Sequence, residues 1–333
     1  MTNLSLPKLA ELLVDEYAAY EFLEGLRWPS GPECPHCGSV NQSTYLKPQD
    51  GKSRATRTGS LSQRRVWKCK NKTCRKQFSV LTGTIFHGSK VPVRTWVLVT
   101  AQMCASKNGM AAREVQRLYG LTPKTAWFVT HRIREAMRSN APNLLVGTIV
   151  ADETWIGGDP KNRHGGDLHW PVHYEPVKIV PGVRRPKTHK TPVLSLVNVE
   201  TGEIRSRVVA DVTAKTLRKV IAEQVAMERS VLETDESPSY KPMSREFAAH
   251  ETVNHRQGIY VRDGISTNKL ENYFSQLKRS INGTHHHVSR EHLPRYLAEF
   301  DFRYSTCDMT DTQRMSALLG RADGRRLAYK LCR

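Results

Sequence analysis

Two pairs of cysteines near the start of the chain constrain its folding more than any other feature. Cys34 and Cys37 stand in the run CPHCGS, and Cys69 and Cys74 stand in the run CKNKTC. A gap of two residues lets both thiolates of one turn reach the same tetrahedral ion, and the longer gap forms a looser second turn. Gly38 after the first pair supplies the backbone angles that such a turn needs. The spacing therefore predicts a closed, structural Zn²⁺ site with four cysteine ligands.

Other interpretations of these cysteines fit less well. A redox-active pair would need a surrounding βαβ pattern, which is missing here, and His36 is a weaker substitute ligand that we place outside the site. The run RKQFSVLTGTIF after the second pair alternates like a β-strand, as expected for a zinc ribbon over residues 31–88. The loop between the pairs, rich in Arg, Lys and Ser, is either a DNA-contacting tip or simply solvated. Cys104, Cys307 and Cys332 are expected to be plain thiols.

The charge of the chain suggests its partner. Lys and Arg number 51 against 32 Asp and Glu, a formal net charge of +19 spread along the whole sequence. Such a field suits a polyanion, so we expect double-stranded DNA, although a merely basic protein remains an alternative. No apolar run reaches the roughly 18 residues that span a bilayer, and the first residues lack a signal-peptide layout. These features predict a cytoplasmic, nucleoid-associated protein with no membrane partner.

A helical pattern follows the predicted ribbon, from Pro92 to Met137. It breaks at Gly120, after which Thr122 and Pro123 form a strong start signal, a capping residue followed by proline at the first helical position. Helix, glycine turn and capped helix are typical of a helix-turn-helix over residues 89–141. Some polar positions of its second helix are candidates to face a DNA groove: Lys124, Thr125, His131, Arg132 and Arg134. An ordinary helical hairpin is the alternative.

Residues 147–309 show a different pattern. A short strand ends at Asp152, and a long loop without clear period follows between Asp159 and Lys190. A hairpin that turns at 200–202, a helix capped by Thr213, a strand ending at Asp235, a further short strand and a polar-faced helix come next. Three strands, a crossover helix and a fourth strand give the topology of an RNase H-like mixed sheet with helices on its faces.

This topology predicts where three carboxylates meet. Asp152 and Asp235 end neighbouring strands, and Glu271 lies on the helix that follows. Hard oxygen ligands of this kind suit two Mg²⁺ or Mn²⁺ ions, the arrangement used in two-metal phosphoryl transfer. Glu153 and Glu236 are adjacent alternatives, but the alternation of a strand turns them to the opposite side. Asp211 also ends a strand, and the helix cap beside it explains it.

The helix with Glu271 carries further polar residues on the same side, in the run TNKLENYFSQLKRSINGTHHH. Lys278 lies two turns beyond Glu271 on the same face and suits a DNA phosphate. The simpler interpretation is a solvated face with one Glu-to-Lys pairing. His285, His286 and His287 either contact phosphate or the surroundings of the metal, or form a surface turn in which one histidine packs.

Together these runs resemble bacterial insertion-sequence transposases of the DDE superfamily, in the group with an N-terminal zinc ribbon and an RNase H-like (ISXO2-like) catalytic domain. The resemblance covers roughly residues 20–305, and DETWIGG with TNKLENYFSQLKR is its most specific part. It implies an enzyme that cleaves the ends of its element and joins the 3′ ends to target DNA, as at least a homodimer. It assigns the acidic ligands to Asp152, Asp235 and Glu271, with Asn268 as an alternative third ligand, the basic residue to Lys278, and a role to His286.

The predicted organisation is thus a helical segment at 1–30, the ribbon, the helix-turn-helix, the catalytic domain and a basic tail at 310–333. Two other functions remain open. A structure-selective nuclease or resolvase of the same fold would cut DNA without joining it. A DNA-binding regulator derived from a transposase would do neither.

Overall fold

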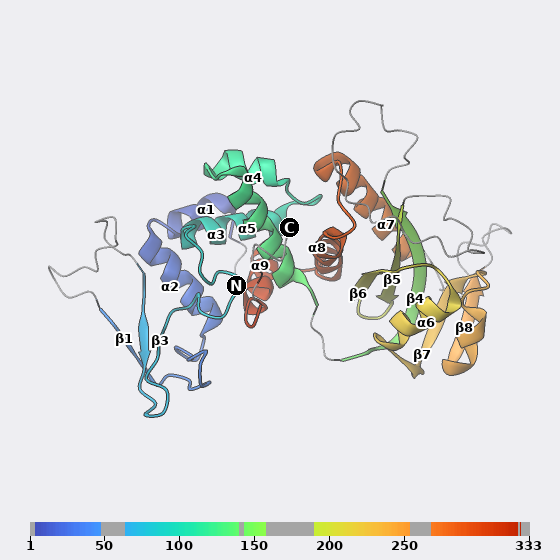
Figure 1. Cartoon of the computed structure of the whole chain (residues 1–333), viewed down its shortest axis with the longest axis horizontal. Helices are drawn as coiled ribbons and strands as arrows, with labels where there is room; N and C mark the ends of the chain where they lie inside the picture. The colour runs from blue at the N-terminus through green and yellow to red at the C-terminus, as the bar shows by residue number, and fades with distance from the viewer. Residues whose placement is uncertain are drawn as a thin grey trace, which may run out of the picture. The chain divides into compact units, whose positions relative to one another are not determined.

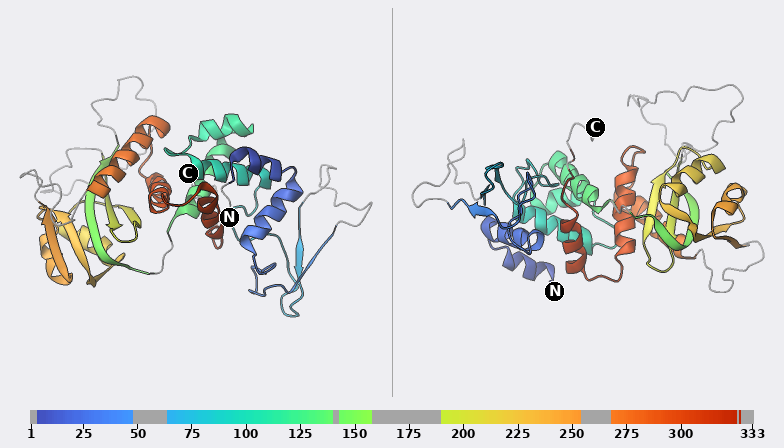
Figure 2. Two further views of the ribbon diagram at one scale, coloured as in Figure 1. Left: turned by 180° about the vertical axis from the view of Figure 1, so that it is seen from behind. Right: turned by 90° about the horizontal axis from the view of Figure 1, so that it is seen from below.

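The computed structural model describes residues 4–47, 64–139, 143–157, 190–253, 268–325 and 327, which are drawn in colour in Figures 1 and 2. The predicted loop 159–190, apart from Lys190, and residues 48–63 of the loop between the cysteine pairs lie outside these residues. The chain divides into two compact units. Unit 1 comprises residues 1–140, 283–285 and 295–333, and unit 2 comprises 141–282 and 286–294. Unit 1 is thus built from segments that lie before, within and after unit 2 along the sequence.

Unit 1 combines a small antiparallel sheet with helices from both parts of the chain. The sheet has the order β1-β2-β3, with strands Ser43–Tyr45, Trp67–Cys69 and Gln77–Phe78. The helices are α1 (Leu6–Leu12), α2 (Glu16–Arg27), α3 (Val93–Ala105), α4 (Ala112–Tyr119), α5 (Pro123–Met137), α8 (Leu293–Ser305) and α9 (Asp311–Gly320). The strand predicted after the second cysteine pair is wrong beyond Phe78, because residues 79–88 form successive turns.

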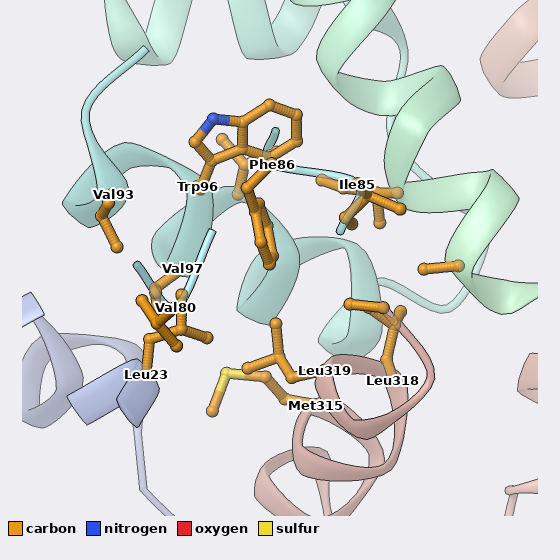
Figure 3. Close-up of a cluster of buried hydrophobic side chains, with 14 of the residues drawn as sticks. Leu23, Val80, Ile85, Phe86, Val93, Trp96, Val97, Met315, Leu318 and Leu319 are labelled. Atoms are coloured by element: carbon orange, nitrogen blue, oxygen red, sulfur yellow. The ribbon is translucent and has the colours of Figure 1, made fainter. Parts of the chain in front are cut away.

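One hydrophobic core joins the helices of unit 1, and Figure 3 shows the part where α2, α3, α9 and the turns after β3 meet. Phe86, from the turns after β3, meets Trp96 of α3 edge to face, with ring centroids 5.2 Å apart. Leu23 of α2 and Leu319 of α9 complete this part of the core, and all four side chains are buried. Residues 311–320, predicted as part of a basic tail, are therefore a packed helix. Its apolar positions recur at helical spacing, and burial of that face against α3 outweighs the surrounding charge.

The helix-turn-helix elements begin and end as predicted, but several of the candidate DNA contacts do not reach the surface. The Thr122 side chain accepts a hydrogen bond from the backbone N–H of Thr125, and Gly120 adopts a left-handed conformation with φ of 62°. His131, Arg132 and Arg134 are, however, buried. They lie on the side of α5 that faces the core, so these three cannot enter a groove. Lys124 is exposed at the start of α5.

Arg134 instead takes part in a buried ionic cluster. Its guanidinium donates to the Glu299 carboxylate at 2.6 Å, and Arg303 donates to the other oxygen of Glu299 at 2.7 Å. Burial alone would raise the pKa of Glu299, but Arg134, Arg303 and then His285 hold it at about 2. Because Arg303 also donates to the backbone carbonyls of Met103 and Ser106, the cluster fixes α8 against α3 and α5.

Unit 2 is a five-stranded mixed sheet with the order β6-β5-β4-β7-β8. β4 pairs with β5 and β5 with β6 in antiparallel fashion, whereas β4–β7 and β7–β8 are parallel. This topology confirms the predicted RNase H-like fold. The elements are β4 (Leu145–Ile156), β5 (Thr191–Asn198), β6 (Ile204–Val208), α6 (Ala214–Ala222), β7 (Val225–Asp235), the 3₁₀ helix η2 (Lys241–Glu246), β8 (Ala249–Val253) and α7 (Asn268–Ser280).

The two helices of unit 2 cover opposite faces of the sheet. Leu217 and Ile221 of α6 pack in one core with Ile149 and Ala151 of β4. Tyr273 of α7 contacts Ser206 of β6 on the other face, where the even-numbered residues of β4 point. None of the helices in the described ranges is both long and apolar enough to cross a membrane.

Candidate metal and catalytic sites

The four predicted cysteine ligands converge. The Cys34 and Cys74 sulfurs are 3.8 Å apart, those of Cys37 and Cys69 are 3.7 Å apart, and all four lie within 4.8 Å of one another. Four sulfurs at about 2.3 Å from one tetrahedral zinc ion stand roughly 3.8 Å from each other. The donor set and its spacing therefore fit Zn²⁺ held by four thiolates.

Two similar backbone turns bring these sulfurs together. The N–H of Gly38 donates to the carbonyl of Cys34 at 2.8 Å, and the N–H of Arg75 donates to the carbonyl of Asn71 at 3.1 Å. Each turn ends in a residue with positive φ, 72° at Gly38 and 51° at Arg75. Burial raises the pKa of Cys34 to about 12, whereas hydrogen bonds with Ser39 lower the pKa of Cys37 to about 6. A buried thiol that stays neutral can pack closely against its neighbours before any ion is bound.

Asp152 and Asp235 lie on adjacent strands and on the same face of the unit 2 sheet. Asp235 is the last residue of β7, as predicted. Asp152 is not the end of its strand, because β4 continues to Ile156 and pairs with β5 throughout. The parallel ladder sets Val150 beside Glu233, and two further residues along both strands bring Asp152 level with Asp235. Residues at equal positions of paired strands point to the same side, so both carboxyl groups face α7.

Glu153 lies on the opposite face, as the alternation predicts. It pairs with Leu194 of the α6-side core, and its Oε1 accepts a hydrogen bond from the buried Tyr240 hydroxyl. Burial, together with the charges of Asp152 and Asp235, raises the pKa of Glu153 to about 7, against the lowering effect of the Tyr240 hydrogen bond. Both aspartates thus influence Glu153 from the other face of the sheet.

The polar stripe on α7 exists, and it is exposed. Glu271, Ser275 and Lys278 are exposed, whereas Leu270, Tyr273, Phe274 and Leu277 are buried against the sheet. Asn268 is the first residue of α7, and its side chain lies outside the described part of the structure. Within the described ranges, the cysteines are the one group of three or more potential metal ligands that converges. The structure thus aligns Asp152 with Asp235 and does not bring the Glu271 carboxylate to them.

The three histidines follow α7 in different environments. His285 ends the π-helix η4 (Ile281–His285) and stacks edge to face on Tyr296 of α8, with ring centroids 4.8 Å apart. His286 and His287 are exposed, and His286 has an unusual positive φ of 59°. The packed histidine of the simpler interpretation is therefore His285, and His286 stays a candidate for contact with DNA.

The sequence did not point to a set of buried hydroxyl groups under α7. Tyr273 Oη lies 2.9 Å from Ser206 Oγ, which lies 2.8 Å from Ser195 Oγ. Ser195 pairs directly with Asp152 across the β4–β5 ladder. Serine at two apolar strand positions was the one available signal, and it is weak, because buried serines are common in sheets.

Comparisons with known proteins match both parts of the chain to transposase families. A family model described as "ISXO2-like transposase domain" matches residues 144–305, and one described as "Transposase zinc-ribbon domain" matches residues 14–77, so that the two together match more than half of the chain. A Halobacterium salinarum protein, described as an uncharacterized protein in transposable element ISH50, is 26% identical over 291 residues, which are 87% of this chain and 91% of that protein.

A solved structure, a simian T-cell lymphotropic virus intasome in complex with PP2A regulatory subunit B56 gamma, is 13% identical with a TM-score of 0.27. The match covers 60% of this chain and 66% of that one. A likeness at this level does not establish a shared fold.

Proposed function

Because the chain belongs to the family of transposases with a zinc ribbon and an ISXO2-like domain, we propose that it cleaves the ends of its own mobile element and joins the 3′ ends to target DNA. The observation that supports this most is the placement of Asp152 and Asp235 on one face of the adjacent strands β4 and β7, the face covered by the helix that carries Glu271. Neighbouring carboxylates on rigid strands form a hard-oxygen set that suits Mg²⁺ or Mn²⁺.

In this proposal Asp152, Asp235 and Glu271 hold two divalent ions. When bound, such ions activate a water or a 3′-hydroxyl and stabilise the leaving oxygen on phosphorus. The strands contribute rigidity, since β4 pairs with β5 from Ile149 to Ile156 and with β7 as far as Val150. The third ligand comes from an exposed helix position, where a carboxylate is accessible to DNA. Asn268, one turn before Glu271, is the alternative third ligand.

Lys278 and His286 serve the DNA instead of the metal. Lys278 is exposed on the same stripe as Glu271 and has no acidic partner among the described ion pairs, so its ammonium is available for a phosphate. His286 is exposed after the end of the π-helix, where its ring is available to a backbone phosphate.

Unit 1 supplies DNA binding in this proposal. Its zinc site makes a closed structural centre without an open coordination position, and Lys124 at the start of α5 is exposed. The net charge of +19 favours a polyanion, so affinity should fall steeply as salt rises. Joining two element ends in one event requires at least two protomers on DNA.

The test uses the purified protein, linear DNA with the flanking sequence of its gene, a supercoiled plasmid and Mn²⁺ or Mg²⁺. We expect joined products with the unchanged protein and a divalent ion, and none with Glu271→Ala. Nicking without joining would instead support a nuclease or resolvase. Binding without chemistry in any metal would support a regulator. Activity in Glu271→Ala that is lost in Asn268→Ala would transfer the third-ligand role to Asn268.

A further inference from the structure

We propose that Tyr273 is a positioning residue, whose hydroxyl fixes the rotation of α7 through Ser206 and Ser195 and thereby keeps Glu271 on the flank of α7 from which it reaches the aspartates when the ions bind. The proposal rests on the proposed function, because it takes Asp152, Asp235 and Glu271 as the ligand set. Nothing in the family comparison assigns a role to Tyr273.

The hydrogen-bonded chain of hydroxyls is buried along its whole length. Tyr273 is 1% exposed, Ser206 3% and Ser195 0%, and the two oxygen–oxygen distances are 2.9 and 2.8 Å. A buried hydroxyl without a partner is costly, so each of these three groups restricts where the others can lie. The apolar contacts of Leu270 and Leu277 carry no such direction. The hydroxyl chain is therefore a directional part of the contact between α7 and the sheet.

A second contact acts on the same flank of α7. Lys269, one turn before Tyr273, donates from Nζ to the carbonyl of Val199 at 2.9 Å, at the end of β5. Residues four apart lie on one side of a helix, so Lys269 and Tyr273 both hold α7 toward the β5–β6 hairpin.

Glu271 stands between these two anchors on the other flank. Each residue turns a helix by about 100°, so Glu271 lies roughly 160° from Tyr273 around the axis of α7. With one flank fixed on β5 and β6, the stripe of Glu271 and Lys278 is turned the other way across the sheet, toward the β7 side of β4 where Asp235 lies. A change in the rotation of α7 would move Glu271 away from the aspartates without unfolding the helix.

The last hydroxyl of the chain lies next to the metal-ligand position. Ser195 is the direct cross-strand partner of Asp152, and such partners have Cβ atoms about 5 Å apart on one face. The path Tyr273–Ser206–Ser195 thus links the position of α7 to the strand residue that lies directly across from Asp152. It connects two parts of the ligand set through side chains that touch neither metal nor DNA.

The experiment compares Tyr273→Phe with the unchanged full-length protein, with Mn²⁺ as the probe. Phenylalanine keeps the apolar ring, so the protein should fold. We expect the Kd for Mn²⁺, measured by the electron paramagnetic resonance signal of free Mn²⁺, to rise about 3- to 10-fold, the range of one buried hydrogen bond. The Mn²⁺ concentration for half-maximal cleavage should rise by the same factor, and excess Mn²⁺ should restore cleavage.

Matched variants separate position from the general loss of a hydroxyl. Tyr119→Phe removes a tyrosine hydrogen bond of 2.8 Å to Gln102 in unit 1 and should leave Mn²⁺ affinity unchanged. Ser206→Ala should reduce Mn²⁺ affinity as much as Tyr273→Phe does. The double variant should bind Mn²⁺ no more weakly than the weaker of the two single variants, because both substitutions break the same hydrogen-bonded path. Amide hydrogen exchange in α7 without metal should be faster in Tyr273→Phe than in Tyr119→Phe.

Two results would count against the inference in different ways. In the first result, Tyr273→Phe keeps the Mn²⁺ affinity and the α7 hydrogen exchange of the unchanged protein, while Glu271→Ala is inactive and binds Mn²⁺ weakly. This result would overturn the role of Tyr273 and leave the proposed function intact. Equal Mn²⁺ binding in the unchanged protein and in Glu271→Ala would overturn Glu271 as a ligand. In that case faster α7 exchange in Tyr273→Phe would reduce the hydroxyl chain to a purely structural contact.

Discussion

The cysteine centre of unit 1 and the proposed carboxylate centre of unit 2 would meet the same demand, several ligands around a metal centre, in opposite ways. The four sulfurs lie within 4.8 Å of one another, whereas Glu271 stays apart on an exposed helix. Carboxylates near neutral pH repel one another, whereas a buried thiol such as Cys34 stays neutral and can pack closely. In the proposed function, the structural centre is therefore assembled with the fold, while the centre for hard ions gathers its last ligand when the ion and DNA arrive.

The largest expected effect comes from breaking the sulfur centre. Cys69→Ser should reduce bound zinc from about one ion per chain to nearly none and unfold the ribbon, since structural zinc contributes on the order of 10 kcal/mol in small zinc domains. Element-end affinity should fall at least about 100-fold. Zinc content and end binding by gel shift measure this. Cys307→Ser, at an exposed cysteine, serves as the control, and equal zinc loss there would contradict the assignment.

Next in size is the loss of one carboxylate in unit 2. Asp235→Asn should reduce metal-dependent cleavage by about 1,000-fold or more, because an amide replaces a charged ligand oxygen. Zinc content and end binding should stay as they are, since both depend on unit 1. Glu236→Gln, at the exposed neighbouring residue, should cleave normally. If Asp235→Asn lost element-end binding to the same extent as cleavage, the assignment of end binding to unit 1 and of cleavage to unit 2 would be wrong.

Glu299 is a buried carboxylate that neighbouring arginines hold in place without a metal ion. Arg134 and Arg303 hold its pKa at about 2 despite burial, below an unfolded value near 4.5. Because the folded pKa is lowered, the stabilisation is fully present above about pH 4.5 and disappears as pH falls through about 2. Glu299→Gln should lower the free energy of unfolding by about 3 kcal/mol at neutral pH and flatten its acid dependence. Urea titrations from pH 7 to 2.5 measure both, and parallel pH profiles for the two proteins would refute the assignment.

The smallest expected effect concerns the DNA side of the α7 stripe. Lys278→Gln should lower cleavage about tenfold, because one phosphate contact is lost, without changing the Kd for Mn²⁺. Arg279→Gln, at the adjacent exposed position on another side of the helix, should have less effect. Cleavage rates with saturating Mn²⁺ at two salt concentrations test this. A changed Mn²⁺ affinity in Lys278→Gln would mean that this residue belongs to the ligand set.

The parts of the fold that local signals determine could be predicted from the sequence. Thr122 and Thr213 cap α5 and α6 where the sequence places them, and the strand order of unit 2 follows from the order of its elements. The cysteine spacing predicted the two turns, and the preference of one tetrahedral ion for four thiolates predicted that the turns converge. The helix caps and the cysteine turns rest on contacts close in the sequence.

What could not be predicted depends on distant contacts. Arg134 resembles a groove-facing residue until Glu299, far along the chain, provides its counter-charge. β4 runs past Asp152 because Thr191–Leu194 of β5 pair with it across a long intervening segment. The gathering of Asp152, Asp235 and Glu271 remains a prediction, and the hydroxyl chain at Tyr273 joins residues from two strands and one helix that no local pattern relates.

The contribution of α9 to the core of unit 1 has a consequence for how the protein is made. Met315, Leu318 and Leu319 pack with the core residues of α2 and α3, so that core closes only after these residues of α9 have left the ribosome. A messenger cut short after the sheet of unit 2 would yield an N-terminal part with an open apolar surface, prone to proteolysis. Under the proposed function, abortive synthesis would therefore leave few folded fragments able to occupy element ends in competition with the intact protein.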